Sequence, residues 1–156
     1  MKKFIFLFVL AGLQVGVFAQ DFSKLADIQL VKPGDYKSAE IQVGKCADYI
    51  LGQALDANEL NKLQCLQFIM RWMEGTPDYT FAIDSDFVNF CGKDVSLSGV
   101  YMAALSSAAV SEKFTDKSPE KLTANARELF LDYCANPANK VKQNKAVKTA
   151  LKERNS

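Results

Sequence analysis

The chain has 156 residues, a near balance of 19 basic against 18 acidic residues, and no histidine. The absence of histidine excludes the Ser-His-Asp and Cys-His nucleophile arrangements. It also excludes the usual zinc sites and the commonest general base near neutral pH. The eight glycines form no phosphate-binding loop pattern, so the composition disfavours most enzyme classes and implies no cofactor.

The first nineteen residues have the pattern of a cleavable secretory signal peptide. Lys2 and Lys3 precede an uncharged, mainly apolar run over residues 4–18, and Val17 and Ala19 satisfy the small-residue rule of a signal peptidase. The run has about fifteen residues, fewer than the roughly 20 that span a bilayer, which favours cleavage near Ala19 over an uncleaved anchor. The pattern predicts a periplasmic or secreted protein whose mature chain has no transmembrane span.

Charge is unevenly distributed over the rest of the chain. Residues 136–156 hold six basic residues and one acidic residue, a net charge of +5, whereas residues 20–135 hold 11 basic and 17 acidic residues, a net charge of −6. Such a basic tail can fold back on the acidic body or be solvated, or it can bind an anionic surface or another exported protein. The mature net charge of −1 gives no signature of a nucleic-acid binder. The lysines available for contact are Lys140, Lys142, Lys145, Lys148 and Lys152.

The first mature segment is predicted to be an extended arm followed by a helix. Residues 20–36 contain the turn signal Pro33-Gly34-Asp35, which is typical of irregular backbone. From Lys37 to about Leu55 the apolar residues take helical spacing. The predicted core face of this helix holds Ala39, Val43, Cys46 and Ile50.

A second helix is predicted from about Asp56 to Glu74. Asp56 and Glu59 have the spacing of a capping box, and Gly75 with Pro77 ends the helix. Its apolar surface is wide, which predicts central burial. The apolar residues are Leu60, Leu63, Leu66, Met70 and Met73 on one side, with Cys65, Ile69 and Trp72 beside them.

The middle of the chain is predicted to hold an extended segment, a short helical turn and a core helix. Residues 79–83 alternate in polarity without an evident partner strand. Residues 84–86 can cap a short turn that carries Phe87 and Phe90. Residues 95–111 carry no charge and include five serines. Their length is at the bottom of the spanning range, so a buried core helix is favoured over a membrane span.

Two further helices complete the predicted fold. Ser118-Pro119-Glu120 is a helix start. Asn136-Pro137 is a second start signal of the same kind, and it precedes a last helix over 140–154. That helix has few apolar residues and is expected to pack loosely. The elements predict an all-α protein: a compact bundle of about five helices in antiparallel hairpins. Its helical domain would span 37–135, with a basic C-terminal helix or tail over 136–156.

The mature chain has four cysteines, an even number in a compartment that permits disulfides. If the first two helices form a hairpin that turns near residue 56, Cys46 and Cys65 lie at the same height on core-facing positions. That geometry favours a Cys46–Cys65 bridge and leaves Cys91–Cys134 by elimination. Four reduced thiols that act as small apolar fillers are the alternative.

Carboxylates are the remaining candidates for chemistry. Five acids gather in one loop-rich stretch, and two of them facing each other across a cleft would suit a glycosidase. Helix caps and solvated loop charges are the alternative interpretation. The five are Glu74, Asp78, Asp84, Asp86 and Asp94.

The most distinctive segment runs from Arg71 to Tyr79 and reads Arg-Trp-Met-Glu-Gly-Thr-Pro-Asp-Tyr. With the Phe-Ala-Gln end of the signal, it resembles uncharacterised exported helical proteins of Bacteroidota-type bacteria. The resemblance implies an exported helical protein and no activity. A helix end anchored by Trp72 is one interpretation of the segment, and a ligand-recognising corner is the other. The corner would consist of Arg71, Trp72, Glu74, Asp78 and Tyr79.

Two functional hypotheses follow. The first is a non-catalytic interaction or structural protein outside the cytoplasm, which would use a helical surface and the basic tail. The second is a carboxylate-dependent hydrolase that acts on an extracytoplasmic substrate such as polysaccharide.

Overall fold

The structure is a computed structural model that describes residues 22–57 and 60–154. The predicted signal peptide over residues 1–19 and the Glu59 half of the predicted capping box lie outside these residues. Within the two described ranges the chain forms six α-helices and two 3-10 helices, and none of their residues is in a strand. The all-α class and a helix count near five are confirmed.

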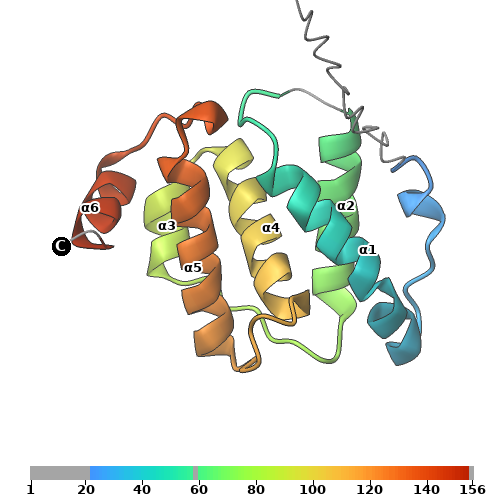
Figure 1. The fold of residues 1–156 in the computed structure, drawn as a ribbon. Helices are drawn as coiled ribbons and strands as arrows, with labels where there is room; N and C mark the ends of the chain where they lie inside the picture. The colour runs from blue at the N-terminus through green and yellow to red at the C-terminus, as the bar shows by residue number, and fades with distance from the viewer. Residues whose placement is uncertain (1–21, 58–59, 155–156) are drawn as a thin grey trace, which may run out of the picture.

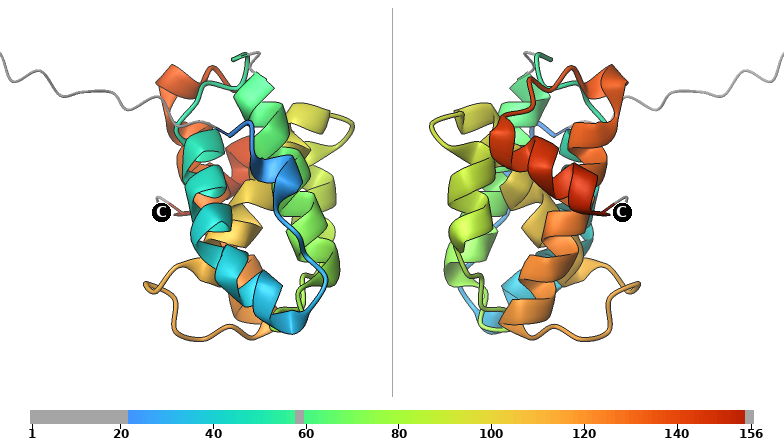
Figure 2. Two further views of the ribbon diagram at one scale, coloured as in Figure 1. Left: turned by 90° about the vertical axis from the view of Figure 1, so that its right-hand side faces the viewer. Right: turned by 90° about the vertical axis from the view of Figure 1, so that its left-hand side faces the viewer.

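The helices are arranged as two antiparallel hairpins with smaller elements at their edges. Figure 1 shows α1 and α2 running in opposite directions, and α4 lying between α1 and α5 with a direction opposite to both. α6 lies on the side of the bundle away from α1 and α2, where it contacts α3 and α5 (Figure 2). The elements are η1 (Leu25–Asp27), α1 (Pro33–Leu51), α2 (Leu60–Gly75), α3 (Ser85–Cys91), α4 (Val95–Val110), α5 (Pro119–Ala135), η2 (Pro137–Asn139) and α6 (Lys145–Arg154).

The uncharged helix α4 is the centre of the bundle. Ten of its sixteen residues are buried, and it contacts α1, α2, α3 and α5. At Gly99 an added Cβ would lie 3.0 Å from the Leu66 side chain, so the glycine permits close packing of α2 on α4. The prediction of a buried core helix is confirmed. Among helices in the described part of the chain, none has the length and apolar character that a membrane crossing requires.

The prediction that α2 is centrally buried is wrong. Leu60, Leu63 and Met70 are 70%, 53% and 46% exposed. The uncharged α4 is apolar all round and occupies the centre, so α2 lies at the edge and packs only one face. That face holds Cys65, Phe68, Ile69 and Trp72.

α1 begins at Pro33, four residues earlier than predicted, because the turn signal is its first turn. The Asp35 carboxylate accepts the backbone N–H groups of Val31 (3.1 Å) and Lys32 (2.9 Å), which lowers the pKa of Asp35. Proline is favoured at the first helical position, where its missing N–H has no partner to lose. The residues before it form η1 and an extended strap along α2 (Figure 2).

Candidate functional site

The predicted recognition corner has Trp72 as its centre, and this side chain is fully buried. Its indole Nε1 donates a hydrogen bond to the Tyr36 carbonyl at 3.1 Å. Its ring lies 5.5 Å from that of Tyr79 and 5.9 Å from that of Phe81. The residues after α2 therefore fold back over the indole, as expected for an extended segment laid across the helices. Trp72 anchors the core and presents no surface to a ligand.

Arg71 fastens the N-terminal strap to α2. Its Nη2 donates to the carbonyls of Leu25 (3.0 Å) and Ile28 (3.3 Å), and its Nη1 donates to that of Ala26 (3.4 Å). The planar guanidinium suits this task because it offers several donors in a fixed geometry. The guanidinium also lies 5.8 Å from the centre of the Phe68 ring. These contacts satisfy carbonyl groups of a short 3-10 helix that has few backbone partners of its own.

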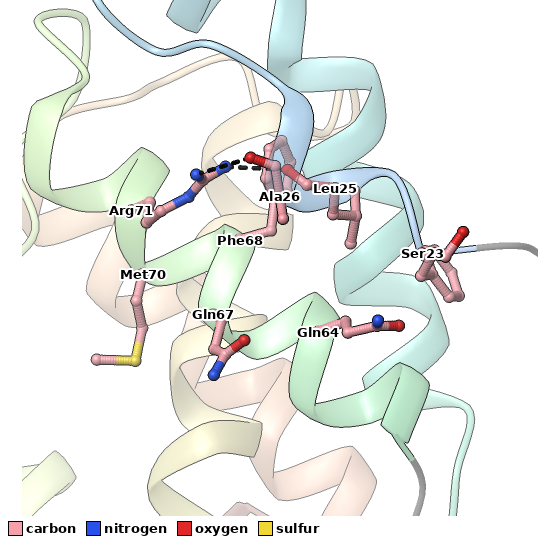
Figure 3. Close-up of a pocket in the computed structure, with 9 residues that line it drawn as sticks. Ser23, Leu25, Ala26, Gln64, Gln67, Phe68, Met70 and Arg71 are labelled. Carbon is pink, nitrogen blue, oxygen red and sulfur yellow. Dashed lines mark hydrogen bonds between the residues drawn. The ribbon is translucent and has the colours of Figure 1, made fainter.

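An apolar hollow of about 360 Å³ lies between the strap and α2. In Figure 3 Arg71 reaches across one end of it to the carbonyls of η1. Phe22 and Phe68 are buried beside it, whereas Met70 is half exposed at its edge. Arg71 is the one predicted corner residue among those that line the hollow, so the corner and the hollow do not form a joint site.

Replacing Arg71 with glutamine tests this fastening role. Loss of the guanidinium bonds is expected to lower the free energy of unfolding by about 1 kcal/mol, because the bonds are partly exposed. It should also speed amide hydrogen exchange in residues 22–32 and leave the rest of the chain unchanged, as hydrogen-exchange mass spectrometry can measure. Glu74→Gln, on the exposed side of the same helix, is the matched control. Unchanged exchange in residues 22–32 would contradict the assignment.

The remaining corner residues are divided between the core and the surface. The Tyr79 hydroxyl donates to Glu40 Oε1 at 2.9 Å, and burial, followed by this hydrogen bond, raises the pKa of Tyr79. Glu40 also pairs with Lys37 at 3.0 Å. Glu74 and Asp78 are exposed. The structure thus brings Trp72 and Tyr79 together as packing groups, directs Arg71 to the strap, and leaves the two acids at the surface.

Two of the five predicted carboxylates cap helices, and a third is in an ion pair. Asp84 Oδ1 accepts the Phe87 N–H at 2.9 Å, and Asp94 Oδ1 accepts the Leu97 N–H at 3.0 Å, so these acids cap α3 and α4. Asp86 pairs with Arg127 Nε at 2.9 Å. Within residues 22–57 and 60–154, no group of three or more cysteine, aspartate or glutamate side chains is placed to hold a metal ion.

The four cysteines are buried and are free thiols in the structure. A hydrogen bond with the Cys46 thiol, together with burial, raises the pKa of the Cys65 thiol. Burial raises the pKa of Cys91 to about 11 and that of Cys134 to about 12, the latter also through the nearby Cys91. Cys46 and Cys65 thus lie side by side, as the hairpin geometry predicts.

The basic tail folds back on the body. Asn139 is buried, and its Nδ2 donates to the Tyr133 carbonyl at 2.9 Å. Gln143 Nε2 donates to the Cys134 carbonyl at 2.8 Å. The 3-10 helix η2 uses the Asn136-Pro137 start signal, and Lys140 ends it with a left-handed backbone at φ 54°. The last helix therefore begins at Lys145 instead of Lys140.

α6 is packed more firmly than its few apolar residues suggest. Val147 is fully buried and Ala150 is 4% exposed. Asn144 caps the helix by accepting the Val147 N–H at 3.0 Å, and its Nδ2 donates to the carbonyls of Asn89 and Phe90 at 3.0 and 2.9 Å. Asn144 is not among the residues predicted from the sequence, although an asparagine just before a helix is a recognisable capping signal.

The outward face of α6 carries a row of lysines. Lys145, Lys148 and Lys152 recur at helical spacing and are exposed, and the exposed Lys142 precedes them. Lys140 lies outside this helix and pairs with Asp56 at 3.0 Å. We call Lys142, Lys145, Lys148 and Lys152 the lysine face.

An open groove of about 540 Å³ adjoins the lysine face, between α6 and the helices α3 and α5. Lys145 belongs to both features. The other polar side chains of the groove carry both hydrogen-bond donors and hydrogen-bond acceptors. They are Asp86, Asn89, Arg127, Asn144, Thr149 and Glu153. Asp86 and Arg127 are paired with each other, and Asn144 bonds backbone groups of α3 and α6.

The sequence analysis also missed the close contact at the end of α2. A Cβ at Gly75 would overlap the hydroxyl and ring of Tyr36, so only glycine fits this position. The Tyr36 hydroxyl in turn donates to the Leu30 carbonyl at 3.0 Å. Gly75 thus allows α1, α2 and the strap to meet at one point.

Comparison of the chain with protein-family models, with curated proteins and with solved structures gives no match.

Proposed function

We propose that the protein is an exported, non-catalytic helical binding protein, and that the lysine face of α6 binds an anionic polysaccharide. The observation that carries the proposal is the row of exposed lysines beside a groove in which polar side chains stand next to the apolar side chains of Phe90, Ala146 and Ala150. Lysines that protrude at helical spacing raise the local positive potential on a molecule whose remaining surface is acidic. The signal-peptide pattern supports export.

A polysaccharide suits this surface better than a lipid bilayer does. An interfacial membrane helix needs an apolar face that it can insert between lipids. In α6 Val147 and Ala150 are buried against the body, and Ala146 and Leu151 are partly buried. The exposed residues of the helix are all polar. A hydroxyl-rich polymer could instead use the amide and hydroxyl groups of Asn89 and Thr149 in the groove while its acidic groups contact the lysines.

The competing hydrolase hypothesis has less support. Asp84 and Asp94 cap helices, and Asp86 is paired with Arg127. Each of these carboxylates already has a structural partner, and Asp86 alone of the five acids lines the groove beside α6. A glycosidase requires two carboxyl groups on opposite sides of the bond to be cleaved.

The proposal predicts selective loss of polyanion binding in a lysine-face variant. In K145Q/K148Q the affinity for dextran sulfate should fall roughly tenfold, since each cation near an anionic surface contributes about 1 kcal/mol or less. The dependence of affinity on salt should weaken as well, because fewer ions are displaced. Isothermal titration calorimetry at several salt concentrations measures both quantities.

Two controls separate specific contact from net charge. K113Q/K121Q removes the same number of charges from exposed lysines elsewhere on the molecule, and it should retain most of the affinity. Uncharged dextran should not bind. Equal losses in the two variants, or binding to phosphatidylglycerol vesicles without binding to dextran sulfate, would refute the proposal.

Export also gives the cysteines a chemical context. In an oxidising compartment, buried thiols in contact become candidates for a disulfide. Cys46 and Cys65 lie near each other on the packed helices α1 and α2, which supports this pairing within the proposal.

A further inference from the structure

Cys46 of α1 and Cys65 of α2 face each other inside the first hairpin. Both residues are 0% exposed, and their thiols lie close enough for Cys46 to raise the pKa of Cys65. The two helices pack along each other, so the backbone holds these two core positions next to each other. A disulfide requires Cα atoms within about 7 Å and Cβ atoms that face each other, which neighbouring core positions on two packed helices suit.

The second pair is less well placed. The Cys91 thiol lies near Ser98 and Asp94, and it raises the pKa of Cys134 through its charge. Cys91 is the last residue of α3 and Cys134 lies in the last turn of α5. Of the three pairings that four cysteines allow, the structure thus favours the one that includes Cys46–Cys65.

We propose that Cys46 and Cys65 form a disulfide. The bond forms while the exported chain folds, before α1 and α2 pack together and bury the two thiols. The inference rests on the proposed export. The two thiols lose two protons and two electrons as the S–S bond forms, and the oxidant is a disulfide of a dithiol oxidase or of glutathione, which is reduced to two thiols.

The timing follows from the burial of both thiols. Exchange requires a thiolate that can reach the disulfide of the oxidant. In the folded protein neither sulfur is accessible to a bulky partner, and the raised pKa of Cys65 keeps its thiolate scarce. An unfolded chain has neither restriction. Once closed, the bridge should be protected from reductants by the same burial.

Refolding in a glutathione buffer tests the pairing and its timing independently of export. Reduced, unfolded protein that refolds with oxidised glutathione should yield the Cys46–Cys65 bridge, identified by peptide mapping without reductant. Reduced protein that is already folded should acquire it at least about tenfold more slowly in the same buffer. A different pairing, four free thiols after refolding, or equal rates in the two samples would overturn the inference.

Two double variants make the test specific. C91A/C134A should still form the bridge, and its oxidised form should melt roughly 10 °C above its reduced form. C46A/C65A should show no such shift on oxidation. A shift in C46A/C65A of the size expected for C91A/C134A would assign the stabilising bond to the other pair and overturn the inference. Failure of cells to export the protein would refute the proposed function without altering these results.

Discussion

Trp72→Ala is expected to lower the free energy of unfolding by about 3–5 kcal/mol. The substitution would empty the space of a fully buried indole and leave the Tyr36 carbonyl without its donor. The rings of Tyr79 and Phe81 would also lose the surface on which they pack. Urea unfolding followed by circular dichroism measures the change.

The neighbouring Met70 provides a control for Trp72. Met70 lies on the same helix and is 46% exposed, so Met70→Ala should cost about 1 kcal/mol or less. If Trp72→Ala does not fold, Trp72→Phe supplies an intermediate case, because it keeps a ring and loses the indole N–H. Equal stability of Trp72→Ala and Met70→Ala would show that the tryptophan is not a core anchor.

Gly75→Ala is expected to lower the free energy of unfolding by about 1–3 kcal/mol. The new methyl group would overlap the Tyr36 hydroxyl and ring, so α1 and α2 must separate or the tyrosine must leave its hydrogen bond with the Leu30 carbonyl. In most helices the same substitution is favourable, because alanine has the higher helix propensity. The sign of the effect is therefore diagnostic of the close contact.

Gly34→Ala is the matched control for Gly75→Ala. Gly34 is also helical, but a Cβ there meets no atom within 4 Å, so the substitution should be neutral or stabilising by up to about 1 kcal/mol. In a Tyr36→Ala background the cost of Gly75→Ala should largely disappear. An unchanged cost in that background would assign the effect to a cause other than the tyrosine.

The sequence was sufficient to predict the elements whose signals are local. Signals of this kind involve only residues that are neighbours in the chain. They are the uncharged run of α4, the caps by Asp84 and Asp94, and the spacing of Ala39, Val43 and Cys46 in α1. The contact between Cys46 and Cys65 follows from one hairpin turn. These features need no knowledge of which helix occupies the centre.

The errors concern features that depend on tertiary arrangement. The exposed Leu60 of α2 is as apolar as the buried Leu122 of α5, and only the central position of α4 decides between them. The partners of several cations are backbone carbonyls, which no side-chain pattern reveals. Lys117 Nζ, for example, donates to the carbonyls of Ala108 and Ser111 at the end of α4, at 3.0 and 2.7 Å.

The residues that make up the candidate site could be predicted from the sequence, but the roles of these residues in the fold could not. The segment from Arg71 to Tyr79 is as distinctive in the structure as in the sequence, but its aromatic and cationic groups point to neighbouring segments of the same chain. The basic tail was found from its charge alone. α6 buries Val147 and turns its lysines outward, and this orientation depends on the Asn144 cap. The charge pattern does not indicate that cap.

A single titration series with dextran sulfate compares the two surfaces most directly. It uses the unmodified protein, the lysine-face variant K145Q/K148Q and the corner variant E74Q/D78N, whose substituted side chains are exposed. The proposed function predicts roughly tenfold weaker binding by the lysine-face variant and no loss in the corner variant. Undiminished binding by K145Q/K148Q together with a loss in E74Q/D78N would contradict it.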